Sequence, residues 1–319
     1  MRFIVLKKKR LMALLVLATL LIVVTFLNSN YYQPESLSSP SFSFVVMSDS
    51  QGNAINNQIN ERRFRQLLTE ITASTTEPNF ILFAGDMVWG EGNIKQPLAR
   101  WKDIVDDYYP IKRVFPAMGN HEHDQAAFSS AFGHLPNNQL PGYQRTVYYF
   151  DYNNSRFIVL NSDRVDQKRR YILDDKQLAW LEKTLASSNK THNFVMLHVP
   201  AYPIGAHYQQ SLDANPEQRD TFWELIDKYD VTAVFNGHEH NYNRRVVDDS
   251  FGEYQNKTLQ LTLGGAGGQL NNYVRDDRNV VVGPAAVYHY LTVEVAGARA
   301  NFTVYDINNR EIDAFTVIQ

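Results

Sequence analysis

The feature that most constrains the fold is an alternation of two hydrophobic patterns, which starts at Phe42 and continues to residue 235. Short apolar runs, of the length of a buried strand, alternate with segments whose apolar residues recur at helical spacing. The apolar runs are residues 42–47, 80–84, 114–117, 194–197 and 231–235, and the helical segments are residues 59–71, 97–108, 174–185 and 215–229. Strands that alternate with helices predict an α/β domain built in layers.

The remaining patterns add strands to this domain. Residues 146–152 and 156–160 predict a hairpin around Asn153-Asn154, because asparagine tolerates turn conformations. Beyond residue 258 we expect strands only, at residues 259–263, 287–295, 301–305 and 312–317. Residues 42–319 contain no internal repeat or linker, so we expect them to form one domain.

The composition supports a folded chain and restricts its chemistry. Aromatic residues make up 13% of the 319 residues, which argues against disorder. The sequence has no cysteine, which excludes disulfides, thiolate metal sites, iron–sulfur clusters and cysteine nucleophiles. Any metal ion must therefore bind to nitrogen and oxygen ligands.

The N-terminal segment differs from the rest of the chain. Residues 1–10 are basic, and the 17 residues 11–27 carry no charge. Such a run is just long enough to span a bilayer, and positive charge tends to stay in the cytoplasm, so residues 28–319 are expected on the other side of the membrane. We expect a membrane anchor; the alternative is a cleaved signal peptide and a secreted or periplasmic chain. Residues 28–41 are rich in Ser, Asn, Gln and Pro and indicate a linker.

The charge of the chain argues against nucleic acid as a partner. The first 27 residues hold five of the 31 basic residues and no acidic one, so the remainder carries 26 basic against 34 acidic residues, a net charge of −8. An acidic body binds phosphate backbones poorly. We therefore expect no nucleic-acid partner, and a membrane contact only through the N-terminal segment.

Each of the five apolar runs is followed by side chains of the kinds that bind metals. Ligands of open α/β sheets bind beyond the carboxyl ends of the strands, so these side chains are expected to lie together. In chain order they are Asp49 and Gln51, then Gly85-Asp86, then Gly119-Asn120-His121-Glu122, then His198, and finally Gly237-His238-Glu239-His240. One aspartate or histidine alone is usually structural, but the joint occurrence of all five indicates a metal site.

The last of these motifs brings two imidazoles close together. In an extended chain the side chains alternate, so His238 and His240 are expected to point the same way and Glu239 to point away. Gly237 allows a tight turn and a close approach to a bound group. Taken alone, the motif is equally compatible with a solvated loop that happens to contain histidines.

In the order and spacing of these motifs, the sequence resembles the calcineurin-like metallophosphoesterases, and more narrowly the purple acid phosphatases. The resemblance covers about residues 42–245, and the glycine-rich residues 264–268 and the strand-rich C-terminal part are also similar to the latter branch. It implies an α/β fold of the four-layer αββα type over residues 42–319. It also implies a phosphoesterase active site with two metal ions, which can be Fe, Mn or Zn.

Carried over by position, the resemblance implies that Asp86 bridges the two metal ions. The first ion would also bind Asp49 and His240, with Gln51 as a further candidate. The second would bind Asn120, His198 and His238. Two divalent ions bring four positive charges against two carboxylates, which leaves a site that attracts phosphate and acidifies a bridging water.

The implied reaction is in-line attack of a metal-bridging hydroxide on the phosphorus of a small phosphoester. His121 would help beside the metals as an electrostatic or acid–base group. His207, nine residues after His198, matches a position proposed in the family to protonate the leaving group. The other interpretation of His207 is a surface histidine in a mobile loop.

Two positions depart from the family pattern. Gln51 stands where many of these enzymes have histidine, and Trp89 stands where purple acid phosphatases have a metal-binding tyrosine. A neutral amide is a weaker ligand than imidazole, and indole is no ligand. We expect an acid-phosphatase-like phosphomonoesterase; the alternatives are a phosphodiesterase for a nucleotide or lipid head group, or a non-catalytic surface binding protein with a weakened first metal site.

Overall fold

Two mixed β-sheets pack face to face in the computed structural model, which describes residues 41–319 except 54–56, 75–76 and 91. The first sheet has the order β15-β14-β13-β1-β4-β5. Its strands are β1 (Phe42–Met47), β4 (Phe80–Phe83), β5 (Val114–Pro116), β13 (His289–Ala296), β14 (Arg299–Asp306) and β15 (Glu311–Ile318). Strands β1, β4 and β5 are parallel, so their carboxyl ends lie at one edge of the sheet.

The second sheet has the order β12-β10-β11-β9-β8-β7-β6. Its strands are β6 (Tyr148–Tyr152), β7 (Ser155–Val159), β8 (His192–Met196), β9 (Ala233–Asn236), β10 (Tyr242–Val247), β11 (Thr258–Leu263) and β12 (Val280–Ala285). Strands β7, β8, β9 and β11 are parallel. A separate short hairpin joins β2 (Gln51–Asn53) to β3 (Asn57–Ile59).

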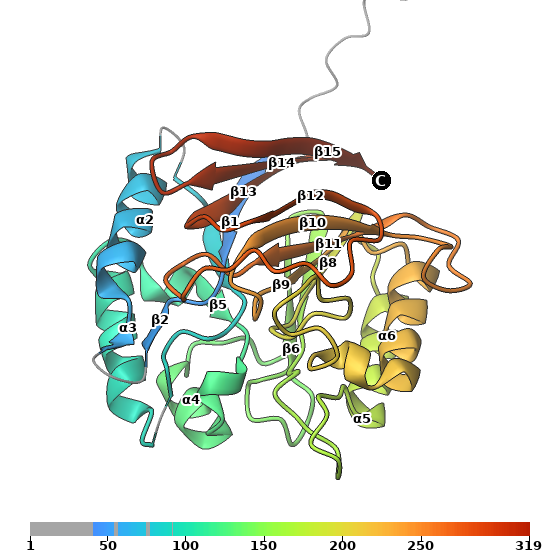
Figure 1. The fold of residues 1–319 in the computed structure, drawn as a ribbon, viewed down its shortest axis with the longest axis horizontal. Helices are drawn as coiled ribbons and strands as arrows, with labels where there is room; N and C mark the ends of the chain where they lie inside the picture. Colours follow the sequence, from blue (N-terminus) through green and yellow to red (C-terminus); the bar gives the residue numbers. More distant parts are fainter. Residues whose placement is uncertain (1–40, 54–56, 75–76, 91) are drawn as a thin grey trace, which may run out of the picture. The chain divides into compact units, whose positions relative to one another are not determined.

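Helices cover the outer face of each sheet (Figure 1). Helices α2 (Glu61–Ala73), α3 (Lys95–Asp106) and α4 (Gln125–Ala131) pack on the first sheet, and α5 (Asp175–Ala186) and α6 (Pro216–Lys228) pack on the second. Aromatic residues fill the space between the sheets, where the ring of Phe44 lies 5.1 Å from that of Phe157 and 5.3 Å from that of Phe194. The layers are thus helix, sheet, sheet and helix, which confirms the predicted αββα arrangement.

The sequence patterns predicted the buried strands and missed several other elements. Strand β10 was missed because Asn243 and Arg245 interrupt its apolar pattern, yet both side chains are buried. Helix α4 and the β2–β3 hairpin are short or polar and give little periodic signal, and Gly283-Pro284 interrupts the apolar run of β12. The predicted anchor at residues 11–27 and the predicted linker at residues 28–41, apart from Ser41, lie outside the described residues. Within residues 41–319, no helix is long and apolar enough to cross a membrane.

One ion pair connects the edge strand β15 of the first sheet to β10 of the second. The Asp313 carboxylate accepts hydrogen bonds from Arg244 Nε and Nη2, at 2.7 and 3.1 Å, and from Tyr242 Oη at 2.5 Å. The side chain of Asp313 is only 7% exposed. Because Tyr242 directly follows residues 237–241, this contact also fixes the loop that carries His238 and His240.

We predict that Asp313→Ala lowers the free energy of unfolding by about 3 kcal/mol, because it leaves the guanidinium of Arg244, which is only 14% exposed, without its partner. Denaturant titration measures this change. Glu182→Ala is the matched control, since it removes the exposed carboxylate that pairs with Lys228 on the surface, and such pairs contribute little. Equal destabilisation by the two substitutions would contradict the assigned role of Asp313.

Candidate metal centre

The loops after β1, β4, β5, β8 and β9 converge at the carboxyl ends of the parallel strands, as predicted. Three of their residues adopt left-handed backbone conformations, with φ of 65° at Asp49, 54° at Asp86 and 69° at His238. This conformation is uncommon for residues other than glycine and tends to occur at functional sites. Three candidate ligands therefore owe their directions to tight turns at the strand ends.

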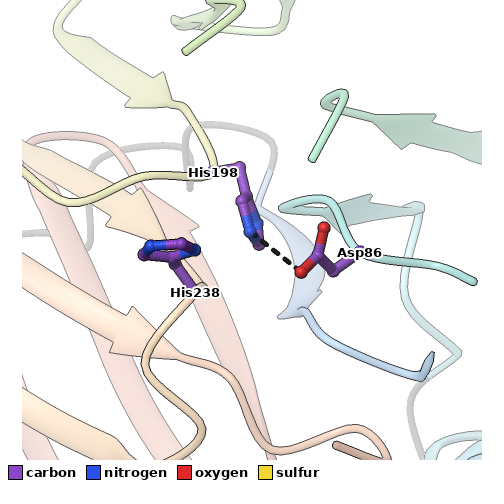
Figure 2. Close-up of side chains that lie close together, drawn as sticks. All are labelled: Asp86, His198 and His238. Atoms are coloured by element: carbon purple, nitrogen blue, oxygen red, sulfur yellow. Dashed lines mark ion pairs between the residues drawn. The ribbon is translucent and has the colours of Figure 1, made fainter. Parts of the chain in front are cut away.

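The second predicted set of ligands is assembled around Asp86 (Figure 2). His198 Nε2 lies 3.2 Å from Asp86 Oδ2. Asn120 Oδ1 lies 3.0 Å from His198 Nε2 and 2.8 Å from His238 Nδ1. Asp86, His198 and His238 each offer a ligand atom within 4.8 Å of the others, so these residues could share one ion.

The first predicted set meets on the other side of the same carboxylate. Asp49, Asp86 and His240 offer ligand atoms within 4.8 Å of one another, and His240 Nε2 lies 3.3 Å from Asp49 Oδ1. Gln51 Nε2 lies 3.1 Å from Asp86 Oδ2 and 3.0 Å from His240 Nε2, whereas Gln51 Oε1 is buried without a partner. Rotation of this amide by a half-turn would direct the unpartnered oxygen to the centre of the set.

The histidines are oriented in the manner of metal ligands. The Nδ1–H groups of His198 and His240 donate to the carbonyls of Ala84 and Gln269, at 2.8 and 3.0 Å. This leaves each Nε2 free to face the carboxylates, which is how surrounding groups usually fix the tautomer of a metal-binding histidine. His238 Nε2 is buried and has no hydrogen-bond partner among the described residues. The residues present therefore fit a pair of metal ions that share Asp86.

Charges in this cluster are strongly coupled. Burial alone would raise the pKa of Asp86, but the neighbouring His198 and His121 outweigh it and lower the pKa to about 2. Burial opposes the charged form of His198, and the Asp86 carboxylate nevertheless raises its pKa to about 10. The acidic centre thus attracts positive charge, which in the loaded protein the metal ions would supply.

The buried side chain of Glu122 holds two of the loops that carry the ligands. Glu122 accepts hydrogen bonds from the backbone N–H groups of Asp86, Val88 and Gly119, at 2.9, 3.1 and 2.9 Å. Burial and the nearby Asp86 carboxylate raise the pKa of Glu122 to about 8, although these donors act against the shift. The side chain ties the loop after β4 to the loop after β5.

The His-x-His motif differs from its prediction in one respect. Strand β9 ends at Asn236, and His238 has a left-handed backbone rather than an extended one. Both histidines still face the centre, because the turn at His238 replaces the expected alternation. Gly237 is required here, since a Cβ atom on it would lie 2.2 Å from Asp49 Oδ2.

Glu239 points away from the centre, as expected, and holds a neighbouring loop. Its carboxylate accepts hydrogen bonds from the N–H groups of Ile204, Gly205 and His207, at 2.5, 2.7 and 3.2 Å. His207 is partly buried, and its ring centroid lies 4.0 Å from that of His238. The structure thus places the His207 ring against His238, one of the candidate ligands.

Trp89 and His121 form a pair at the edge of the centre. The His121 ring lies 4.5 Å from the indole ring, and His121 Nδ1 lies 2.5 Å from the Trp89 carbonyl oxygen. His121 Nε2 lies 3.9 Å from Asp86 Oδ2. Trp89 therefore supports His121 at the position where a purple acid phosphatase would have its tyrosine.

A sixth strand end, not predicted from the sequence, also lies at the centre. Strand β7 is parallel to β8, and it leads to Asn161-Ser162-Asp163 beside His198. Burial and the Asp86 carboxylate raise the pKa of Asp163 to about 7. An aspartate after a strand resembles any turn residue, so only the pairing of β7 with β8 could have identified it.

A family profile for calcineurin-like phosphoesterases matches residues 42–242, which is more than half of the chain. The chain belongs to the calcineurin-like phosphoesterase family. This stretch of the phosphoesterase includes every candidate ligand named above, from Asp49 to His240.

Comparison with individual proteins agrees with the family. The chain is 24% identical over 226 residues to "Probable inactive purple acid phosphatase 27" of Arabidopsis thaliana, covering 61% of this chain and 36% of the relative. It is 30% identical over 189 residues to the "Probable cyclic nucleotide phosphodiesterase" of Rhodococcus erythropolis, covering 56% of each chain. The structure of purple acid phosphatase PPD1 from yellow lupin aligns with a TM-score of 0.69 at 17% identity, covering 88% of this chain and 54% of that chain. The chain thus spans from about a third to somewhat more than half of these proteins.

We predict that Gln51→Ala weakens one metal site more than the other, because Gln51 lies beside Asp86 and His240 and not beside His198 or His238. Titration calorimetry with Mn²⁺ should show affinity reduced by about 10-fold or more at one of two sites. Asn53→Ala is a control in the same strand that keeps Gln51. Equal loss of metal affinity at both sites, or no loss at either, would contradict the assignment of Gln51 to the first set of ligands.

Proposed function

We propose that the protein is a metal-dependent phosphoester hydrolase, and most specifically an acid-phosphatase-like phosphomonoesterase. One observation supports this above the others: two groups of potential ligands, Asp49-Asp86-His240 and Asp86-His198-His238, share a single carboxylate. Two metal ions held by these residues would activate water and stabilise charge on a phosphoryl group. Membership of a phosphoesterase family supports the same reaction class.

The chain's own residues supply orientation and proton-transfer groups around this centre. His121 lies next to Asp86, and His207 lies next to His238, so the two imidazoles stand beside different parts of the centre. A phosphoester held between them would have donors for its non-bridging oxygens and for its leaving oxygen. We assign His121 to the phosphoryl group and His207 to the leaving group, as the family resemblance implies.

Two other functions have specific support. A phosphodiesterase is supported by the Rhodococcus relative, which is named a probable cyclic nucleotide phosphodiesterase. A binding protein without turnover is supported by Gln51 in the first ligand set and by the Arabidopsis relative, which is named probable inactive. Hydrolysis assays with one aryl monoester, one aryl diester and one cyclic nucleotide would distinguish the phosphomonoesterase, the phosphodiesterase and the binding protein.

We predict that the full-length protein with Mn²⁺, Zn²⁺ or Fe hydrolyses p-nitrophenyl phosphate and that Asp86→Asn reduces kcat by more than about 100-fold. Loss of a direct metal ligand should reduce activity more than loss of a residue that contacts only the ligands. Thermal unfolding in parallel verifies that the variant is folded. Phosphate binding without hydrolysis under every metal and pH would support the binding protein instead.

We further propose that the catalytic domain is held on the extracytoplasmic side of a membrane by residues 11–27. The support is the sequence pattern, in which four consecutive basic residues at 7–10 precede 17 uncharged ones. A small phosphoester and the membrane would then be the two partners of the protein.

We predict that the chain stays in the membrane fraction after alkaline washing, and that protease added outside intact cells digests the domain. Intact-mass measurement distinguishes the alternative, since signal cleavage would shorten the chain by roughly the signal-peptide length of 15–30 residues. A full-length chain in the soluble cytoplasmic fraction would contradict both the membrane anchor and the cleaved signal peptide.

A further inference from the structure

The sixth strand end places an unpaired carboxylate beside the metal centre. Val159 of β7 is in register with Met196 of β8, so the chain leaves both strands at the same edge of the sheet. Ser162 Oγ then accepts a hydrogen bond of 2.9 Å from the N–H of Val199, the residue after His198. Asp163 therefore lies on the His198 side of the centre.

The side chain of Asp163 makes no hydrogen bond or ion pair with any other residue in the described part of the chain, unlike those of Asn161 and Ser162. Its sequence neighbour Arg164 is directed elsewhere. The Arg164 guanidinium lies 4.4 Å from the ring centroid of Tyr143, and its Nη1 lies 3.3 Å from Asp174 Oδ2. The carboxylate thus remains available to a ligand.

The short hairpin that follows Asp163 places an aromatic ring against His238. Residues 164–172 form a small hairpin in which Val165 pairs with Tyr171 and the Ile172 N–H donates to the Arg164 carbonyl at 2.9 Å. The Tyr171 ring lies 5.6 Å from that of His238, nearly perpendicular to it. Burial, together with the negative charges of Asp163 and Asp86, raises the pKa of Tyr171 to about 12.

A free carboxylate beside a phosphate site needs a physical reason. Asp163 is not among the groups that can share a metal ion, and its negative charge repels a phosphoester that carries no positive charge. A substrate with a cationic leaving group converts this repulsion into attraction. Carboxylates and aromatic faces together are what proteins use to bind ammonium groups.

We infer that Asp163 and Tyr171 form the leaving-group subsite and that the preferred substrates are phosphoesters of amino alcohols, such as phosphocholine or phosphoethanolamine. This inference rests on the proposed phosphoesterase function and specifies its substrate class. The phosphoryl group lies at the shared Asp86, and the ammonium group lies between the Asp163 carboxylate and the Tyr171 ring. Arg164 stays on Tyr143 and Asp174.

The test compares phosphocholine with 3,3-dimethylbutyl phosphate, in which carbon replaces the charged nitrogen at nearly equal size. At about pH 8, where the carboxyl of Asp163 is ionised, we expect kcat/KM of the full-length Mn²⁺-loaded protein to be about tenfold higher for phosphocholine. Asp163→Asn should bring the ratio to about one, because it removes both the attraction for the ammonium group and the repulsion of the uncharged ester. Tyr171→Phe should keep the preference, and Tyr171→Leu should reduce it.

Asp277→Asn is the matched control, because it removes an exposed carboxylate from a different loop and should leave the ratio unchanged. A second readout needs neither metal nor turnover. By saturation-transfer NMR with the metal-free full-length chain, choline should bind and 3,3-dimethylbutanol should not, and Asp163→Asn should abolish the choline signal.

The outcomes separate this inference from the proposed function. Hydrolysis of both esters with equal efficiency, or choline binding that survives Asp163→Asn, would overturn the inference alone. Hydrolysis of neither ester, nor of p-nitrophenyl phosphate, would overturn the proposed function and the inference together.

Discussion

The structure depends on one buried carboxylate, that of Asp86, which belongs to both groups of potential metal ligands. Burying a charge is costly unless it is paired, and here the pairing groups come from loops of both sheets: His198 from the second sheet and His121 and Gln51 from the first. The two sheets must therefore keep a fixed relation at this edge. The aromatic packing between them and the contact of Asp313 with Arg244 stabilise that relation far from the chemistry.

Two glutamates within the ligand motifs also hold the loops around the centre in place. Glu122 accepts hydrogen bonds from two backbone N–H groups of the loop after β4 and one of its own loop, and Glu239 accepts three from the loop after β8. Backbone donors held in this way are satisfied without water, so the loops can be buried while their ligands stay in place. In both motifs the amide and imidazole side chains face the centre, and the glutamate side chains bind the loops.

Much of this could be predicted from the sequence, because metal-binding residue types follow buried apolar runs and parallel strands end at one edge. The prediction failed where the deciding interaction is not local. The left-handed turn at His238 depends on Asp49, whose carboxylate accepts the N–H of His238 at 3.1 Å. Strand β10 depends on Asp276, whose carboxylate and backbone carbonyl accept hydrogen bonds from the buried Arg245. The position of Asp163 beside the centre could be recognised only from the pairing of β7 with β8 and from the position of Tyr171.

If two metal ions share Asp86, anomalous diffraction from crystals of the Mn²⁺-loaded protein should locate both of them. We expect two peaks on either side of the Asp86 carboxylate, about 3.5–4 Å apart, one beside Asp49 and His240 and the other beside Asn120, His198 and His238. A single peak, or two peaks of which only one contacts Asp86, would contradict the account.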